Sequence, residues 1–183
     1  MAATMRLISV NVSLPKTVTL MRRSVHTAFF KEPVRGAFPL SRLGLQGDGQ
    51  ADPKYHGGPG KAVYLYPFEH YAYWSAVLAR TDLLPGAFGE NFTTEGLLET
   101  ETGIGDVLAI GSAKLRVTQP RTPCAKLGLR MGSMSFVRTF AAAGRPGFYL
   151  SVVEEGFVEA GDAITRIATD PTRLTVAEVF AGG

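Results

Sequence analysis

Short stretches of apolar and polar residues alternate along this chain, and glycine or proline separates most of them. Alternation over four to eight residues with such boundaries indicates β-strands, and many short strands in succession indicate a barrel or a sandwich. The 21 glycines and 11 prolines support this interpretation. We therefore expect a mostly β fold, with strands at Met5–Val12, Ala62–Tyr66, Asp106–Ile110, Ala113–Gln119, Phe148–Val153 and Ala163–Ile167.

One pair of these segments has the form of a hairpin. Asp106–Ile110 and Ala113–Gln119 flank the turn-forming pair Gly111-Ser112, and apolar residues occupy alternate positions of the second arm. That arm runs directly into Pro120. The sheet is therefore expected to deliver the following loop, which contains Cys124, at the end of a strand.

Helical patterns are fewer. Pro67 is suited to start a helix that continues to Arg80, and Ser133 or Ser135 is suited to cap a short helix with Phe136 on its buried face. The end of the chain, "LTVAEVFAGG", begins amphipathic and stops at two glycines. Because no linker or low-complexity tract interrupts the chain, residues 1–183 are expected to form a single domain.

The composition of the chain limits the classes of protein to which it can belong. Hydrophobic residues make up 45% and charged residues 19% of the 183, so the chain can bury a core. The net charge of +3 suits a small anionic ligand, and because the basic residues form no run we expect no nucleic-acid partner. No apolar run approaches the roughly 20 residues of a membrane span. A single cysteine rules out an internal disulfide and fits the reducing cytoplasm.

The first cluster that could carry chemistry runs from Gly47 to Lys61, "GDGQADPKYHGGPGK", and it ends in His56-Gly57-Gly58-Pro59-Gly60-Lys61. A glycine-rich backbone lets amide N–H groups approach an anion, and the lysine adds positive charge. It is not a phosphate-binding P-loop, because Ala62 follows Lys61 where Ser or Thr is required. The structural alternative is a surface loop with a histidine in a turn.

The second cluster is the segment "GENFTTEGL", in which Glu90 and Asn91 are followed by two threonines. A carboxylate, an amide and two hydroxyls in a glycine-bounded loop can orient a polar ligand by hydrogen bonding. A buried carboxylate bonded to loop amides is the equally weighted alternative.

The third cluster is "QPRTPCAKL", which holds the only cysteine. A free cysteine is most often a small buried hydrophobe. Here Arg121 and Lys126 lie within three residues of Cys124, and positive charge favours the thiolate. Pro120 and Pro123 restrict the loop to few shapes. The cluster therefore predicts a reactive or metal-facing thiolate.

Together these clusters, with the earlier "TAFFKEPVRG", resemble the MOSC domain, which is named for the C-terminal part of molybdenum cofactor sulfurases. The combination of HGGP-K, GEN and QPR-PC-KL is most similar to the stand-alone bacterial branch tied to resistance to 6-N-hydroxylaminopurine. The resemblance covers roughly residues 5 to 168 and implies a β-barrel, closed or partly open. It also implies that residues 172–183 are a short remnant of the helical C-terminal region of longer relatives.

The resemblance further implies a molybdenum-pterin cofactor with Cys124 as the metal ligand. Cationic and amide donors would hold the phosphate of that cofactor, and Arg121, Lys126 and Lys61 are the candidates. His56 and Glu90 are the candidate proton donors, with His56 favoured because its ordinary pKa is near neutrality. Related sulfurases also carry a pyridoxal-phosphate domain, which this chain is too short to contain.

The implied activity is reduction of N-hydroxylated compounds such as hydroxylaminopurine-type bases and amidoximes, with an electron-donating reductase as partner and a homodimer as a possible assembly. Two alternatives remain open on the same thiol. One is a cofactor-binding or sulfur-carrier module that uses a persulfide on Cys124. The other is a thiol hydrolase that pairs Cys124 with His56.

Overall fold

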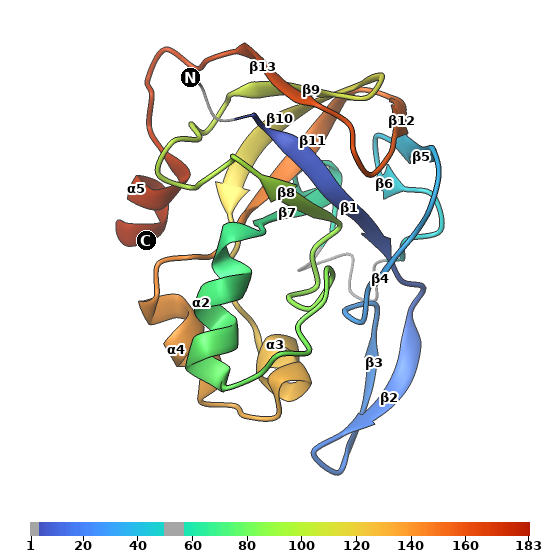
Figure 1. Cartoon of the computed structure of the whole chain (residues 1–183), viewed down its shortest axis with the longest axis vertical. Helices are drawn as coiled ribbons and strands as arrows, with labels where there is room; N and C mark the ends of the chain where they lie inside the picture. Colours follow the sequence, from blue (N-terminus) through green and yellow to red (C-terminus); the bar gives the residue numbers. More distant parts are fainter. Residues whose placement is uncertain (1–3, 50–56) are drawn as a thin grey trace.

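The computed structural model describes residues 4–49 and 57–183, and its main feature is an eight-stranded sheet (Figure 1). The strand order is β13-β9-β10-β11-β7-β8-β1-β4. All neighbours are antiparallel except β7 and β8, which run parallel. The strands of this sheet are β1 (Arg6–Val12), β4 (Glu32–Pro33), β7 (Val63–Pro67), β8 (Phe92–Glu95), β9 (Val107–Ile110), β10 (Ala113–Pro120), β11 (Phe148–Glu154) and β13 (Ile164–Ala168).

Smaller elements surround the sheet. A hairpin of β2 (Lys16–Leu20) and β3 (Arg23–Thr27) projects away from it (Figure 1). A three-stranded sheet joins β12 (Gly156–Val158), β5 (Phe38–Ser41) and β6 (Gly44–Leu45). The helices are the short 3-10 helix η1 (Pro59–Lys61), α2 (Glu69–Leu78), α3 (Ala125–Met131), α4 (Phe136–Ala142) and α5 (Val176–Ala181).

The large sheet curls so that its two ends approach each other. The amide of Leu7 in β1 donates to the carbonyl of Asp162 at 2.9 Å, and the amide of Ile164 donates to the carbonyl of Met5 at 2.9 Å. An isolated bridge links Arg6 to Ala163. The amide of Gly161 also donates to the carbonyl of Leu7 at 2.7 Å, but β1 and β13 are not paired neighbours in the sheet. The expected mostly β fold is confirmed, and of the two expected barrel forms the sheet matches the partly open one.

Two hydrophobic cores lie on opposite faces of the central strands. Along β7, Val63 and Leu65 point into the barrel core, while Tyr64 and Tyr66 join an aromatic cluster on the other face. This alternation is the ordinary two-residue period of a strand. The aromatic cluster packs the helices α2, α3 and α4 against the sheet, with Trp74 and Phe140 stacked at 5.2 Å between ring centroids.

Most expected elements are present with small shifts at their ends. The hairpin around Gly111-Ser112 is the pair β9–β10, and the predicted helices are α2 and α4. The end of the chain forms α5, with a capping box between Thr175 and Glu178 and with Val176 buried in the barrel core. Its interpretation as a remnant of a longer helical region stays a prediction.

Several elements were not predicted, namely the strands β2, β3, β4, β5, β6, β8 and β12 and the helices η1 and α3. The hairpin β2–β3 lacks a clear turn signal because Met21 and Arg22 supply the positive φ angles where glycine is usual. Strand β8 lies inside the segment expected to be a loop. Helix α3 begins immediately after Cys124, in a segment for which no helix was predicted. Within residues 4–49 and 57–183, no helix is long and apolar enough to cross a membrane.

Candidate functional site

A cavity of about 90 Å³ lies where the ends of several strands meet α3. The residues that line it come from far-apart parts of the chain. Lys61 and Tyr64 lie at η1 and β7, Tyr149 lies on β11, and Cys124 precedes α3. The remaining lining residues are Thr27, Ala28, Phe29, Lys31, Asp48, Gly49, Ala62, Gly89, Asn91, Arg121 and Lys126.

Cys124 reaches this cavity because β10 ends just before it. The register of β10 against β11 pairs Pro120 with Phe148, and the amide of Arg121 donates to the carbonyl of Gly147 at 3.1 Å. Cys124 then occupies the position before the first residue of α3 in extended conformation. Its side chain is partly exposed and is not packed away in a core.

Arg121 is the most constrained cation of the site. It is 4% exposed, and its guanidinium carbon lies 4.7 Å from the ring centroid of Tyr64 and 5.4 Å from that of Phe29. Burial by itself lowers the pKa of Arg121, but the attraction of Tyr64, Tyr149 and Cys124 outweighs it and raises the pKa. The group therefore stays positively charged.

One nitrogen of this guanidinium has no hydrogen-bond partner among the described residues. Nη1 of Arg121 is buried and makes no hydrogen bond to any residue the structure describes. Buried donors are nearly always paired, because leaving one unpaired costs roughly 1–3 kcal/mol. An unpartnered charged donor in a residue that lines a cavity fits a site built for an anionic or oxygen-bearing ligand.

Lys61 and Lys126 line the same cavity. Nζ of Lys61 lies 5.6 Å from the ring centroid of Tyr149. The hydroxyl of Thr118 on β10 donates to the carbonyl of Gly60 at 2.7 Å, which fixes the segment carrying Lys61 against the sheet. The structure thus brings together Cys124 and all three predicted cations.

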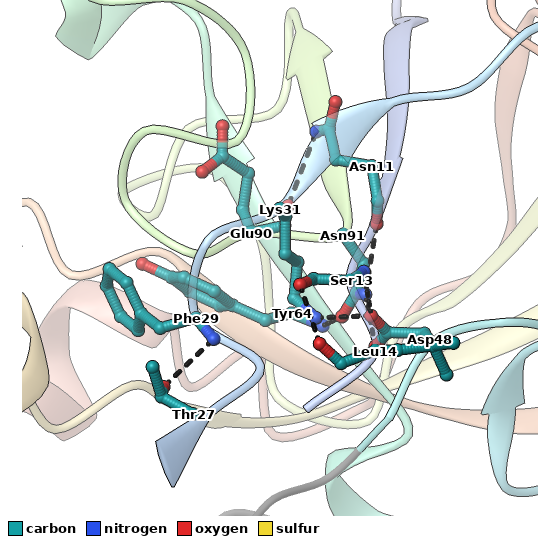
Figure 2. A network of polar contacts seen from close by, with 10 residues as sticks. All are labelled: Asn11, Ser13, Leu14, Thr27, Phe29, Lys31, Asp48, Tyr64, Glu90 and Asn91. Carbon is teal, nitrogen blue, oxygen red and sulfur yellow. Dashed lines mark hydrogen bonds and ion pairs between the residues drawn. The ribbon is translucent and has the colours of Figure 1, made fainter. Parts of the chain in front are cut away.

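Asn91 also lines the cavity, and its side chain is fully bonded. Its Oδ1 accepts from the amide of Tyr64 at 3.0 Å, and its Nδ2 donates to Asp48 Oδ2 at 2.9 Å (Figure 2). Asp48 in turn forms an ion pair with Lys31, with Nζ and Oδ1 separated by 2.6 Å. Lys31 and Asp48 had no predicted role. Asp48 lies within the first cluster, Gly47 to Lys61, and Lys31 lies in the segment "TAFFKEPVRG" that contributes to the family resemblance.

Glu90 is buried behind the site and does not line the cavity. Its carboxylate accepts hydrogen bonds from Tyr71 Oη, from the amides of Gly86 and Phe88, and from Thr93 Oγ1. Figure 2 shows the carboxylate pointing away from Asp48. Burial raises the pKa of Glu90, and these donors oppose the shift. This arrangement favours the alternative of a carboxylate that holds the loop, and its catalytic role stays a prediction.

The other predicted residues are placed only in part. His56 lies outside the described residues, so its proton-donor role and its pairing with Cys124 remain predictions. Gly57 and Gly58 do not line the cavity as described. Gly58 is the residue before the first turn of η1, which carries Lys61. Its φ angle of +92° is one that glycine adopts without strain.

No group of three or more His, Cys, Asp or Glu side chains suited to hold a metal occurs in residues 4–49 and 57–183. A metal at Cys124 would therefore take its further ligands from a cofactor. A molybdenum-pterin group fits the donors present, which are one soft thiol and several cations for a phosphate.

The comparison with family models decides the family. The model described as the MOSC domain matches residues 52–165. The chain belongs to the MOSC domain family. It is 43% identical to YflK of Bacillus subtilis over 169 residues, which is 92% of this chain and 76% of YflK. MOSC domains are generally molybdenum-cofactor-binding domains.

Two further comparisons concern the fold and the length of related proteins. The crystal structure of YiiM from Geobacillus stearothermophilus superimposes with a TM-score of 0.81 at 32% identity, covering 96% of this chain and 82% of that one. A protein of Gibberella moniliformis named as a reductase is 31% identical over 158 residues, which is 85% of this chain but only 28% of the reductase. The match to this chain thus covers a small part of a much longer protein.

Proposed function

We propose that this MOSC protein is a molybdenum-cofactor-dependent reductase of N-hydroxylated compounds, with Cys124 as a ligand of the metal. The observation that carries the proposal is the pairing, in one cavity, of the chain's only thiol with a buried guanidinium that has an unpaired Nη1. The reductase name of the Gibberella relative supports the class of reaction.

Each residue of the cavity has a separate task in this proposal. Cys124 would hold the metal, and Arg121, Lys61 and Lys126 would hold the phosphate of the pterin. When bound, the cofactor supplies the two-electron redox chemistry, which no side chain of the cavity can supply. The protein would bind the cofactor and the N-hydroxylated substrate and orient them toward each other. Two electrons would come from a reductase partner.

Mutation of the thiol tests the proposal. After expression in a host that makes the cofactor, the wild type should contain close to one molybdenum atom per chain and should reduce 6-N-hydroxylaminopurine with reduced methyl viologen. Cys124→Ser should lose both properties. Ala125→Ser, at the exposed neighbouring position, is the matched control and should keep both. Full metal and full activity in Cys124→Ser would disprove the proposal.

The sulfur-carrier alternative predicts a different outcome in the same preparations. Mass spectrometry would then find a labile extra sulfur on Cys124 and metal analysis would find no molybdenum. A partly exposed thiol at a cavity suits a persulfide as well as a metal, so this measurement accompanies the metal analysis.

A further inference from the structure

Lys31 lies between two cavities. It lines the cavity that contains Cys124, and it also lines a second cavity of about 380 Å³ together with Phe30, Arg80, Leu83 and Arg130. A cavity needs only about 10–15 Å³ to hold a water molecule. The second cavity is therefore large enough to hold water beside the residue Lys31.

The ammonium group of Lys31 is held in one position. Its Nζ lies 2.6 Å from Asp48 Oδ1, and the two side chains are only 9% and 11% exposed. Asp48 is itself fixed, because Oδ1 accepts from the amide of Ser13 at 2.8 Å and Oδ2 accepts from Asn91 Nδ2 at 2.9 Å (Figure 2). A cation with so little freedom is suited to direct a proton to one point.

The surroundings make this ammonium a stronger acid than a surface lysine. Burial lowers the pKa of Lys31, and the attraction of Asp48 and of the more distant Glu90 opposes part of the shift. The other charged groups that line the first cavity, Lys61, Arg121 and Lys126, are cations. They share it with the titratable Tyr64, Cys124 and Tyr149. The charged groups of the second cavity are Glu32, Arg80, Asp82 and Arg130.

From this geometry we infer that Lys31, positioned by Asp48, donates a proton to the oxygen of the N-hydroxylated substrate. The inference rests on the proposed reductase function. The reaction is R–NH–OH + 2 e⁻ + 2 H⁺ → R–NH₂ + H₂O, in which the N–O bond breaks. Lys31 supplies the proton that the departing oxygen takes to become water. The second proton reaches nitrogen from solvent, and the electrons come from the reductase partner.

The variant Lys31→Arg separates a role of Lys31 as proton donor from a purely electrostatic role. An arginine at position 31 keeps the positive charge but holds its proton too tightly to act as an acid. Lys31→Arg should therefore lower kcat by about 100-fold or more, as loss of a general acid does, with unchanged molybdenum content. Lys31→Met should behave alike. Lys16→Gln removes an exposed ion pair with Glu32 and is the matched control.

The carboxylate of Asp48 gives the pH test. Because Asp48 raises the pKa of Lys31, Asp48→Asn should move the alkaline limb of the kcat profile to lower pH. The same shift should be seen without metal or substrate, by NMR of the apo protein labelled with ¹³C at the lysine ε-carbons. Lys31 should titrate below the usual lysine value of about 10.4 in the wild type and lower still in Asp48→Asn.

Several results would overturn the inference. One is a Lys31→Arg variant with wild-type kcat and pH profile, and another is loss of molybdenum from the Lys31 variants, which would make Lys31 a cofactor-binding residue. The inference would also be overturned if the Lys31 resonance titrated at the ordinary lysine value and Asp48→Asn did not change that value. A wild type without metal or activity counts instead against the reductase proposal, and the NMR titration still decides whether Lys31 is an acid.

Discussion

The guanidinium of Arg121 lies between two aromatic rings, 4.7 Å from the centroid of Tyr64 and 5.4 Å from that of Phe29. Aromatic faces attract a cation but give it no hydrogen bonds. The structure thus holds a buried charge in place while leaving Nη1 unpaired. Such an arrangement is poor for stability and well suited to binding.

This arrangement predicts that Arg121 serves binding and contributes little to folding. Arg121→Met should change the free energy of unfolding of the apo protein by less than about 2 kcal/mol, because the lost cation–π contacts are offset by removal of a buried charge. The molybdenum content should fall at least tenfold. Urea denaturation and metal analysis measure the two effects.

Arg138→Met, at an exposed position of α4, is the control and should change neither quantity. If Arg121→Met instead unfolded the apo protein while Arg138→Met did not, Arg121 would be a structural residue and its role in binding the cofactor would lose its support.

Glu90 is predicted to stabilise the fold strongly. Glu90→Ala leaves the Tyr71 hydroxyl, the amides of Gly86 and Phe88, and the Thr93 hydroxyl without their common acceptor. We expect a loss of about 3–5 kcal/mol in the free energy of unfolding, as for removal of one partner from a buried charged network. Chemical denaturation measures it.

The matched control for this loss is Glu95→Ala, which breaks an ion pair with Arg6 whose side chains are about half exposed. Exposed pairs contribute about 0–1 kcal/mol. Equal effects of the two substitutions would show that the bonds to Glu90 do not hold the loop.

Gly89 is predicted to tolerate no side chain. Its φ of +81° is unfavourable for other residues, and an added Cβ would come within 2.6 Å of the ring of Phe29. Gly89→Ala should therefore destabilise the protein by about 1–3 kcal/mol and weaken ligand binding, because Phe29 lines the cavity. Thermal unfolding and metal analysis would report both effects.

Gly60→Ala is the control for backbone substitution, since an added Cβ there meets nothing within 4 Å and the φ angle is not in the left-handed region. It should leave the melting temperature nearly unchanged. A Gly89→Ala variant as stable as Gly60→Ala would contradict the close packing against Phe29.

Stability is predicted to fall at alkaline pH. Burial raises the pKa of Tyr64, Tyr66 and Tyr71 well above their usual value. Between about pH 10 and those raised values, the unfolded chain loses phenolic protons that the folded chain keeps. Each such group therefore lowers the free energy of unfolding by about 1.4 kcal/mol per pH unit in that range.

Tyr66→Phe should reduce this slope, and Tyr73→Phe, at a partly exposed position, should reduce it less. Denaturation midpoints between pH 9 and 11 provide the measurement. The lowered pKa of Lys31 acts in the opposite direction below about 10.5, so the comparison between variants is the test. Identical slopes in the two variants would count against burial as the cause.

The sequence predicts the fold where its signals are local. The hairpin β9–β10 has alternating residues around Gly111-Ser112, and the strand β11 is a compact apolar run, so both were expected within a residue or two. The approach of the two ends of this partly open sheet could not be predicted from local signals. It depends on the amide of Leu7 donating to the carbonyl of Asp162 and on the amide of Ile164 donating to the carbonyl of Met5, between segments about 155 residues apart.

The site divides in the same way. Arg121, Cys124 and Lys126 are neighbours in sequence, so their grouping was predicted from spacing alone. Lys31 and Asp48 meet because β4, which follows Lys31, pairs with β1. The segment carrying Asp48 is bonded to Ser13 just after β1, since Asp48 accepts from the amide of Ser13 and the amide of Gly49 donates to the carbonyl of Ser13. A charged residue inside the apolar stretch "TAFFKEPV" was the one available signal for Lys31.

The alternation along β7 and β11 has a consequence for how this domain can diversify. Inward residues such as Leu65 and Leu150 belong to the barrel interior, whereas Tyr64 and Tyr149 face the helices and border the thiol. Replacing or extending the helical layer would alter what enters the pocket while leaving the scaffold's inner packing intact. New specificities are therefore most readily acquired on the outer face of these two strands.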